Sequence, residues 1–283
     1  MRSNNPVFNR SPEFNGQTTY AGNGQAYGGY GQPNPYGQTD PYQTQGGQPG
    51  YPDLQEQGRM TIDSVVQKTG ITLLTVIAFA AATWMLIGDV SAQTAGMLYG
   101  AMLVGGGAAF LLSLVNSFKR VISPGLVLAF AAAEGVALGA FSKFFDAQFG
   151  GGIVVQAVLG TFAALAGTLA AYKFFNITVS NKFRKFVVSA MFGMVALGLL
   201  EMVLGMFGNG LGLFADGALG LLFAVAGLVL GVFMLLLDFD FAERGVAAGL
   251  AERESWRAAF GLTVSLVWIY TNLLRILAIF QQD

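Results

Sequence analysis

Seven apolar runs follow Arg59, and they constrain the fold of this chain more than any other feature. Each is close to the roughly 20 residues that an α-helix needs to cross a hydrocarbon core of ~30 Å. The runs are 71–88, 95–116, 124–142, 153–172, 186–207, 217–237 and 258–280. The breaks between them are polar or rich in glycine. The sequence therefore predicts an all-α membrane protein in which residues 59–283 form seven transmembrane helices.

The composition agrees with a membrane-embedded chain and disfavours several classes of function. Hydrophobic residues make up 54% of the chain and charged residues only 11%, whereas a soluble domain carries about a quarter charged residues. The net charge of −1 and the scattered bases favour no nucleic-acid partner. The chain has no His and no Cys, so disulfides, thiol nucleophiles and His or Cys metal sites are excluded. Any proton chemistry must use Asp and Glu, and we expect no enzymatic activity and no cofactor.

Residues 1–58 differ sharply from the rest of the chain. They are rich in Gln, Gly, Asn and Tyr, and they contain every proline except Pro124. Such a segment buries too little apolar surface to offset its ordering entropy, so we expect a disordered cytoplasmic tail. It lacks the apolar stretch of a cleavable signal peptide. Two interpretations stay open: a solvated tail, or a Tyr- and Gln-rich segment that self-associates or binds a protein partner.

The positions of Lys and Arg predict an orientation in the bilayer. With a cytoplasmic N-terminus, the inner segments hold every Lys and Arg except Lys143 and Arg275. An excess of bases on one side marks the cytoplasmic face. The sequence therefore predicts a cytoplasmic N-terminus and an exoplasmic C-terminus.

Three ionisable side chains lie inside the apolar runs, where each costs roughly 2.5–3.5 kcal/mol at the bilayer centre. At a rise of about 1.5 Å per residue, Glu201 and Arg275 lie at similar depths near the outer face. They either form an ion pair, or Arg275 extends alone to the headgroups. Glu134 lies near the midplane, either protonated and packed on a backbone carbonyl or as a station on an ion or proton path.

The stretch FMLLLDFDFAERG, residues 233–245, places Asp238 and Asp240 at the expected end of the sixth helix. Two residues on an α-helix span about 200°, so the two side chains should point to opposite sides. We expect Asp238 to face the bundle and Asp240 to be the more hydrated of the two. Two acids at a helix C-terminus oppose the helix macrodipole, which favours a functional role.

Three small-residue motifs, Gly96-x-x-x-Gly100, Gly135-x-x-x-Gly139 and Gly227-x-x-x-Gly231, permit helices to approach closely in lipid. We expect packing seams within the bundle, and the alternative is a dimer interface.

Two stretches resemble the Bax inhibitor family: LLLDFDFAERG at the sixth helix and GLTVSLVWIYTNLLRILAIF at the seventh. The resemblance covers roughly residues 59–280, and its most specific pieces are Asp238 and the run from Asn272 to Arg275. The N-terminal MRSNNPVF and the polar tail resemble the actinobacterial branch. The resemblance implies a central seventh helix surrounded by the other six, a bacterial plasma-membrane location and a proton-sensitive calcium leak.

The resemblance also implies a latch on the cytosolic side, in which one aspartate from the sixth helix and one from the seventh share a proton. Asp238 matches the first, but the second position holds Ser265. We therefore expect Asp238 to accept a hydrogen bond from Ser265 or Thr263. Asp240 would supply a second carboxylate only if the helix end is distorted.

Two functions stay open. The first is an ion leak gated near Asp238, with Asp238 and Asp240 as transient calcium ligands, because carboxylates suit a hard cation. Lys119 and Arg120 correspond to the family's basic partner near the inner end of the second helix, and they would pair with Asp238. The second function is a non-transporting stress-response scaffold that regulates partners such as a membrane protease. An intramembrane aspartyl protease is disfavoured, because both aspartates lie on one helix.

Overall fold

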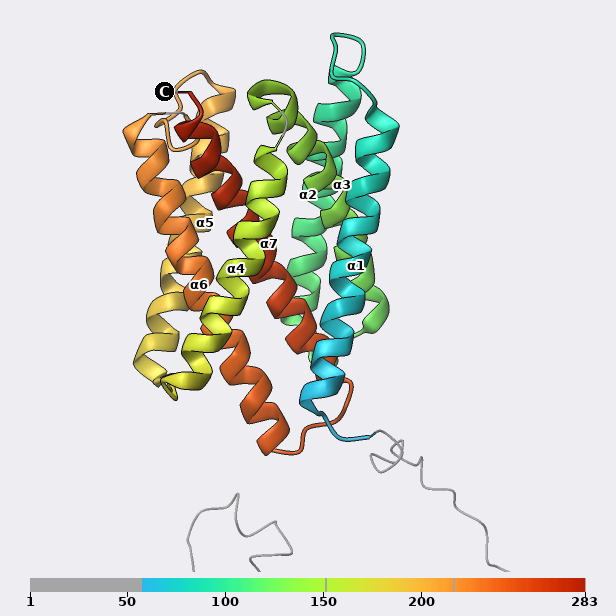
Figure 1. Cartoon of the computed structure of the whole chain (residues 1–283), viewed down its shortest axis with the longest axis vertical. Helices are drawn as coiled ribbons and strands as arrows, with labels where there is room; N and C mark the ends of the chain where they lie inside the picture. Colours follow the sequence, from blue (N-terminus) through green and yellow to red (C-terminus); the bar gives the residue numbers. More distant parts are fainter. Residues whose placement is uncertain (1–57, 151, 216, 283) are drawn as a thin grey trace, which may run out of the picture. The chain divides into compact units, whose positions relative to one another are not determined.

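The computed structural model describes residues 58–150, 152–215 and 217–282, which form seven α-helices and no strand (Figure 1). The helices are α1 (Ile62–Ile87), α2 (Ala95–Phe118), α3 (Pro124–Phe149), α4 (Ile153–Phe174), α5 (Asn181–Met206), α6 (Ala218–Ala247) and α7 (Glu254–Phe280). All seven are long and apolar enough to cross a membrane. The predicted fold class is confirmed, while the predicted disordered tail lies outside the described residues, apart from Gly58.

Local signals set where the helices begin and end. Thr61 and Ser64 form a capping box at the start of α1, each side chain accepting the other's backbone N–H at 3.0 Å. α1 therefore begins nine residues before its apolar run. Ser180 accepts the N–H of Phe183 at 3.1 Å and starts α5 in the same way. Pro124 occupies the first turn of α3, where its missing N–H costs nothing.

The sixth helix extends well beyond the predicted end at residue 237. α6 continues through Asp238 and Asp240 to Ala247. Charged residues are tolerated in these last turns because Asp240 pairs with Arg244 one turn later, at 2.8 Å. The macrodipole acts mainly on the terminal turn, so the expected penalty on the two aspartates does not apply.

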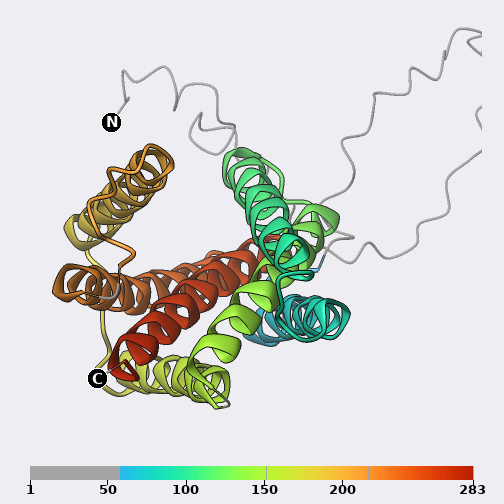
Figure 2. The same cartoon turned by 90° about the horizontal axis from the view of Figure 1, so that it is seen from above.

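The seventh helix lies inside the bundle, as the resemblance implied (Figure 2). α7 packs against α1, α3, α4 and α6. Ile269 and Leu274 on α7 are fully buried and anchor two of the apolar clusters. α2 packs mainly on α3, and α5 packs on α6. Four helices therefore surround α7 directly, and the other two lie outside them.

Two of the three glycine motifs are packing seams within the bundle. A Cβ added at Gly135 or Gly139 would collide with the backbone of α1 near Ala80. Gly227 and Gly231 face Asn272 and Ile269 on α7 in the same way. The motif of Gly96 and Gly100 is different, because a Cβ at either position would meet open space.

Candidate functional site

Asp238 projects from α6 toward the central helix α7. Ser265 Oγ donates a hydrogen bond to Asp238 Oδ2 at 2.5 Å. The Ser265 side chain is fully buried, and Asp238 is half-buried. Gly261, one turn before Ser265, provides the space for the carboxylate, since a Cβ there would lie 2.6 Å from Asp238 Oδ1. Asp238, Ser265 and Gly261 together form what we call the α6–α7 contact.

Of the partners expected for Asp238, only Ser265 contacts it. Thr263 donates instead to the carbonyl of Ala259 at 2.8 Å, within its own helix. Lys119 and Arg120 are exposed, and their backbone carbonyls accept from Arg257 Nη2 at 3.5 and 2.9 Å. The expected pairing of these two bases with Asp238 is therefore not found among the described residues.

Asp240 points away from α7 and lies against α5. Its Oδ2 pairs with Arg184 Nη2 and its Oδ1 with Arg244 Nε, both at 2.8 Å. The two aspartates point to opposite sides of α6, as expected. The expectation that Asp240 is the more hydrated is wrong: it is only 4% exposed, because α5 and the two arginines cover it. Since α6 is undistorted and both oxygens are engaged, Asp240 does not join Asp238 as a second carboxylate.

Two further contacts connect the last turns of α6 to α4 and the α4–α5 connection. Arg244 Nη2 donates to the carbonyl of Val179 at 2.8 Å. Tyr172, near the end of α4, donates its hydroxyl hydrogen to Glu243 Oε2 at 2.6 Å. The side of α6 opposite the α6–α7 contact is therefore held by a polar network.

The described residues contain no cluster of three or more His, Cys, Asp or Glu that could hold a metal ion. A calcium ion prefers six to eight oxygen ligands, according to general coordination chemistry. Asp238 therefore offers at most one carboxylate to an ion that passes, and a resident calcium site is not formed by these side chains.

Glu201 fixes a loop at the opposite end of the bundle. Its carboxylate accepts three backbone N–H groups, from Leu211, Gly212 and Leu213, at 2.6, 2.9 and 3.2 Å. Glu201 is 7% exposed. These three backbone N–H donors satisfy the hydrogen-bonding capacity of the buried carboxylate, and no Lys or Arg side chain is needed.

Arg275 holds the same loop from α7. It donates to the carbonyl of Leu213 at 2.7 Å. Its guanidinium carbon lies 5.1 and 5.9 Å from the ring centroids of Phe214 and Phe223. Of the two alternatives, the ion pair between Glu201 and Arg275 is not found among the described residues, and Arg275 contacts this loop instead of extending alone to the headgroups. The two side chains instead hold one loop from two helices, which agrees with their similar depth.

The remaining intramembrane candidates, Asn272 and Glu134, lie apart from the α6–α7 contact. Asn272 donates to the carbonyl of Trp268 at 2.8 Å and packs against Gly227. Glu134 lies half-buried in the middle of α3. Within the described part of the chain no hydrogen bond to its carboxylate is found, so the contact with a backbone carbonyl, one of the two alternatives, has no support. A station on an ion or proton path stays a prediction.

Two residues of this region were missed at the level of sequence. Gly261 lies one helical turn from Ser265, so the spacing alone places it on the face that meets Asp238. Arg184 gives no such signal, because it is far from Asp240 in sequence and reaches it only through the packing of α5 on α6.

A family model described as Bax inhibitor 1 like matches residues 5–282 of the chain. A comparison with curated proteins gives no match.

Proposed function

The chain belongs to the Bax inhibitor family, and on this premise we propose that it is a membrane ion-leak protein with its gate at the α6–α7 contact. The observation that carries the proposal is the hydrogen bond from Ser265 to Asp238. It joins the longest helix to the central one through a single carboxylate. An ionisable side chain within a spanning helix is costly unless it is paired, and such residues commonly mark ion pathways.

The contact supports a gate because it is small and reversible. A hydrogen bond contributes about 1 kcal/mol net, so its loss changes a two-state equilibrium by about fivefold. The freed carboxylate would then be available to a passing cation, and calcium is the ion that the family and the oxygen chemistry favour. Calcium as the ion, and pH as its control, are parts of this proposal.

Calcium flux into proteoliposomes tests the proposal. We expect Ser265→Ala to raise flux about fivefold, because it removes the donor that holds the carboxylate. We expect Asp238→Asn to lower flux, because it removes the charge that attracts the cation. Asp63→Asn is the matched control, since Asp63 is an exposed carboxylate in the first turn of α1. No flux from any protein, or equal flux from the wild type and Asp238→Asn, would contradict the proposal.

A further variant tests the family's pH switch in this chain. Ser265→Asp places a second carboxylate beside Asp238, and two such groups held together share a proton. We expect its flux to become more dependent on pH than that of the wild type. An unchanged pH profile would show that the α6–α7 contact does not control the leak.

The second candidate function is a scaffold that acts through the N-terminal residues, and one observation favours it. Met60 N–H donates to the carbonyl of Leu250 at 2.8 Å, and Glu252 N–H donates to the carbonyl of Gly58 at 2.7 Å. Lys68, on α1, adds an ion pair to Glu252 at 2.7 Å, so residues just before α1 and on α1 are joined to the α6–α7 connection. A partner that binds the preceding residues would therefore act next to the α6–α7 connection.

Removing residues 1–57, which spares the Gly58 contact, separates the two candidates. The scaffold function predicts unchanged calcium flux in vesicles together with loss of stress protection in cells. Unchanged protection in cells would remove the scaffold candidate.

A further inference from the structure

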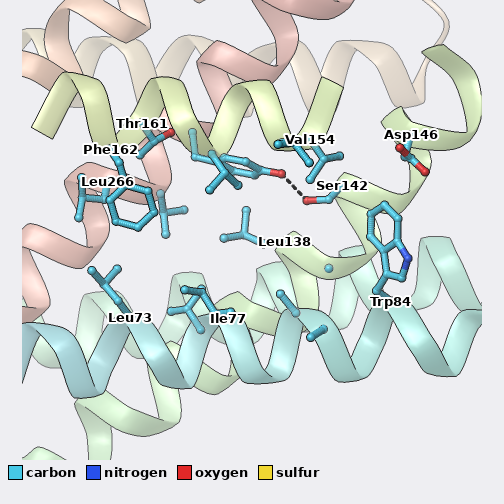
Figure 3. A pocket seen from close by; sticks show the side chains of 18 of the residues that line it. Leu73, Ile77, Trp84, Leu138, Ser142, Asp146, Val154, Thr161, Phe162 and Leu266 are labelled. Carbon is cyan, nitrogen blue, oxygen red and sulfur yellow. Dashed lines mark hydrogen bonds between the residues drawn. The ribbon is translucent and has the colours of Figure 1, made fainter. Parts of the chain in front are cut away.

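A groove of about 480 Å³ lies between α1 and α4, with α3 and α7 forming its floor (Figure 3). Its lining is almost entirely apolar and includes Ile77, Trp84, Leu138, Val154, Phe162 and Leu266. α1 and α4 are not in close backbone contact, and Ile77 and Phe162 are 52% and 46% exposed. Since both helices are long and apolar enough to span a membrane, the groove opens sideways toward lipid. We call it the α1–α4 groove.

The floor of the groove needs no polar ligand. Ser142 and Tyr270 meet there, and one hydroxyl donates a hydrogen bond to the other across 2.6 Å. The dashed line at Ser142 in Figure 3 marks this bond. Each hydroxyl oxygen thereby takes part in a hydrogen bond, so covering the pair with an apolar chain costs less than covering two hydroxyls that have no partner. This favours a hydrocarbon ligand over a polar solute along the length of the groove.

The charged side chain that lines the groove, Asp146, lies at one end. Asp146 and Trp84 lie together at this end, while Leu73 and Leu266 lie at the other (Figure 3). Lys143 places its Nζ 4.7 Å from the ring centroid of Trp84. Lys143 and Asp146 are one turn apart on α3, and Asp146 makes no ion pair with any described residue. This end of the groove thus has a lining carboxylate, Asp146, and a cation, Lys143, against the lining residue Trp84.

We propose that the α1–α4 groove binds one phospholipid with a primary-amine headgroup, of the phosphatidylethanolamine type. An acyl chain fills the groove, Lys143 contacts the phosphate, and Asp146 contacts the ammonium group. Phosphatidylcholine presents the same phosphate, but its quaternary ammonium cannot donate a hydrogen bond to Asp146. The headgroup lies at the end where α3 connects to α4, which is the outer leaflet in the predicted orientation.

A helix from a second copy of the chain is a poorer occupant. A helix with its side chains is about 10 Å across and rises about 5.4 Å per turn, so one turn occupies roughly 400 Å³. A groove of about 480 Å³ therefore holds little more than one turn. The volume instead falls in the range of pockets that take a single small ligand, about 300–1,000 Å³.

Tryptophan fluorescence provides the test, because Trp84 lines the groove and bromine on a lipid chain quenches indole fluorescence on contact. The full chain is reconstituted in phosphatidylcholine that contains a minor fraction of brominated phosphatidylethanolamine or brominated phosphatidylcholine. The Trp84→Phe variant measures the background fluorescence of Trp256 and Trp268. We expect the brominated ethanolamine lipid to quench Trp84 at about threefold lower mole fraction, as expected for an exposed charge pair.

Substitutions at the charged end separate the contribution of the lipid headgroup from that of the acyl chain. Asp146→Asn should abolish the preference between the two lipids, whereas Asp89→Asn, an exposed carboxylate at the same end of the bundle, should leave it unchanged. Lys143→Gln should weaken quenching by both lipids equally. Equal quenching by both lipids in the wild type would overturn the proposal, as would a preference that survives Asp146→Asn.

Occupancy by a second copy is tested separately. The chain has no Cys, so Ile77→Cys introduces one thiol into the groove. Lipid occupancy predicts no disulfide-linked dimer under oxidising conditions, and a dimer in high yield would overturn it.

Discussion

At the scale of single residues, two aspartates on one helix are given different environments by their angular positions. Asp238 meets a buried serine and a glycine on α7, whereas Asp240 meets two arginines. Helical geometry was enough to predict that they point apart. The resemblance limited the expected donor to Ser265 or Thr263, and the structure shows that Ser265 makes the contact. The burial of Asp240 could not be predicted, because Arg184 comes from another helix and only tertiary packing brings it near.

Gly261 gives a sharp test of the α6–α7 contact. In Gly261→Ala the new Cβ would press on the Asp238 carboxylate at 2.6 Å, so we expect a loss of about 1–3 kcal/mol in the free energy of unfolding. Gly193→Ala, where a Cβ meets open space on α5, should be neutral or stabilising by up to about 1 kcal/mol. Thermal unfolding in one detergent compares the two. Equal stability of both variants would mean that the glycine is not needed for the carboxylate.

At the scale of elements, the apolar runs predicted the helices well, because the length needed to cross a bilayer is a local property of sequence. The helix ends were harder, since they depend on caps and on charge pairs that extend a helix into the polar region. The Asp240–Arg244 pair extends α6, and the Thr61–Ser64 box starts α1 early. Both features consist of polar residues, so neither appears in the hydrophobic pattern from which the apolar runs were predicted.

Of the seven helices, α5 has the smallest interface with the rest of the bundle. Among the seven described helices, α5 makes close backbone contacts with α6 alone, and Arg184 pairs with Asp240 across that interface. Arg184 is 44% exposed, so we expect Arg184→Gln to cost only about 1 kcal/mol. The position of α5 should nevertheless become more variable.

Spin labels can measure this variability, since the chain has no native Cys. Labels at Phe192→Cys on α5 and Leu103→Cys on α2 occupy exposed positions. Arg184→Gln should broaden the distribution of distances between them. Lys185→Gln, at an exposed neighbouring position, should leave the distribution as in the wild type. A distribution as narrow as that of the wild type in Arg184→Gln would show that apolar packing alone holds α5.

At the scale of the whole bundle, the distribution of bases predicts how the described helices lie in the membrane. Lys119, Lys182 and Arg257 lie at the end where α1 begins, and Lys143 lies toward the other end. With the cytoplasm on the base-rich side, an impermeant maleimide should label Gln148→Cys in intact cells. It should label Lys182→Cys only after permeabilisation, although both positions are exposed. The reverse pattern would invert the topology and place the amine headgroup proposed for the α1–α4 groove in the inner leaflet.

The central position of α7 has a consequence for biogenesis. This helix follows the other six in the chain, and yet it supplies the surface on which α1, α3, α4 and α6 assemble. Before α7 enters the bilayer, α1, α2 and α3 can already pack on one another, and α4 and α5 can pack on α6, but the helix that contacts both groups is still missing. In the final step α7 brings in several buried polar side chains, among them Thr263, Ser265 and Asn272. Synthesis that stalls before residue 254 should therefore yield inserted but incompletely assembled helices, which expose the surfaces that α7 would cover.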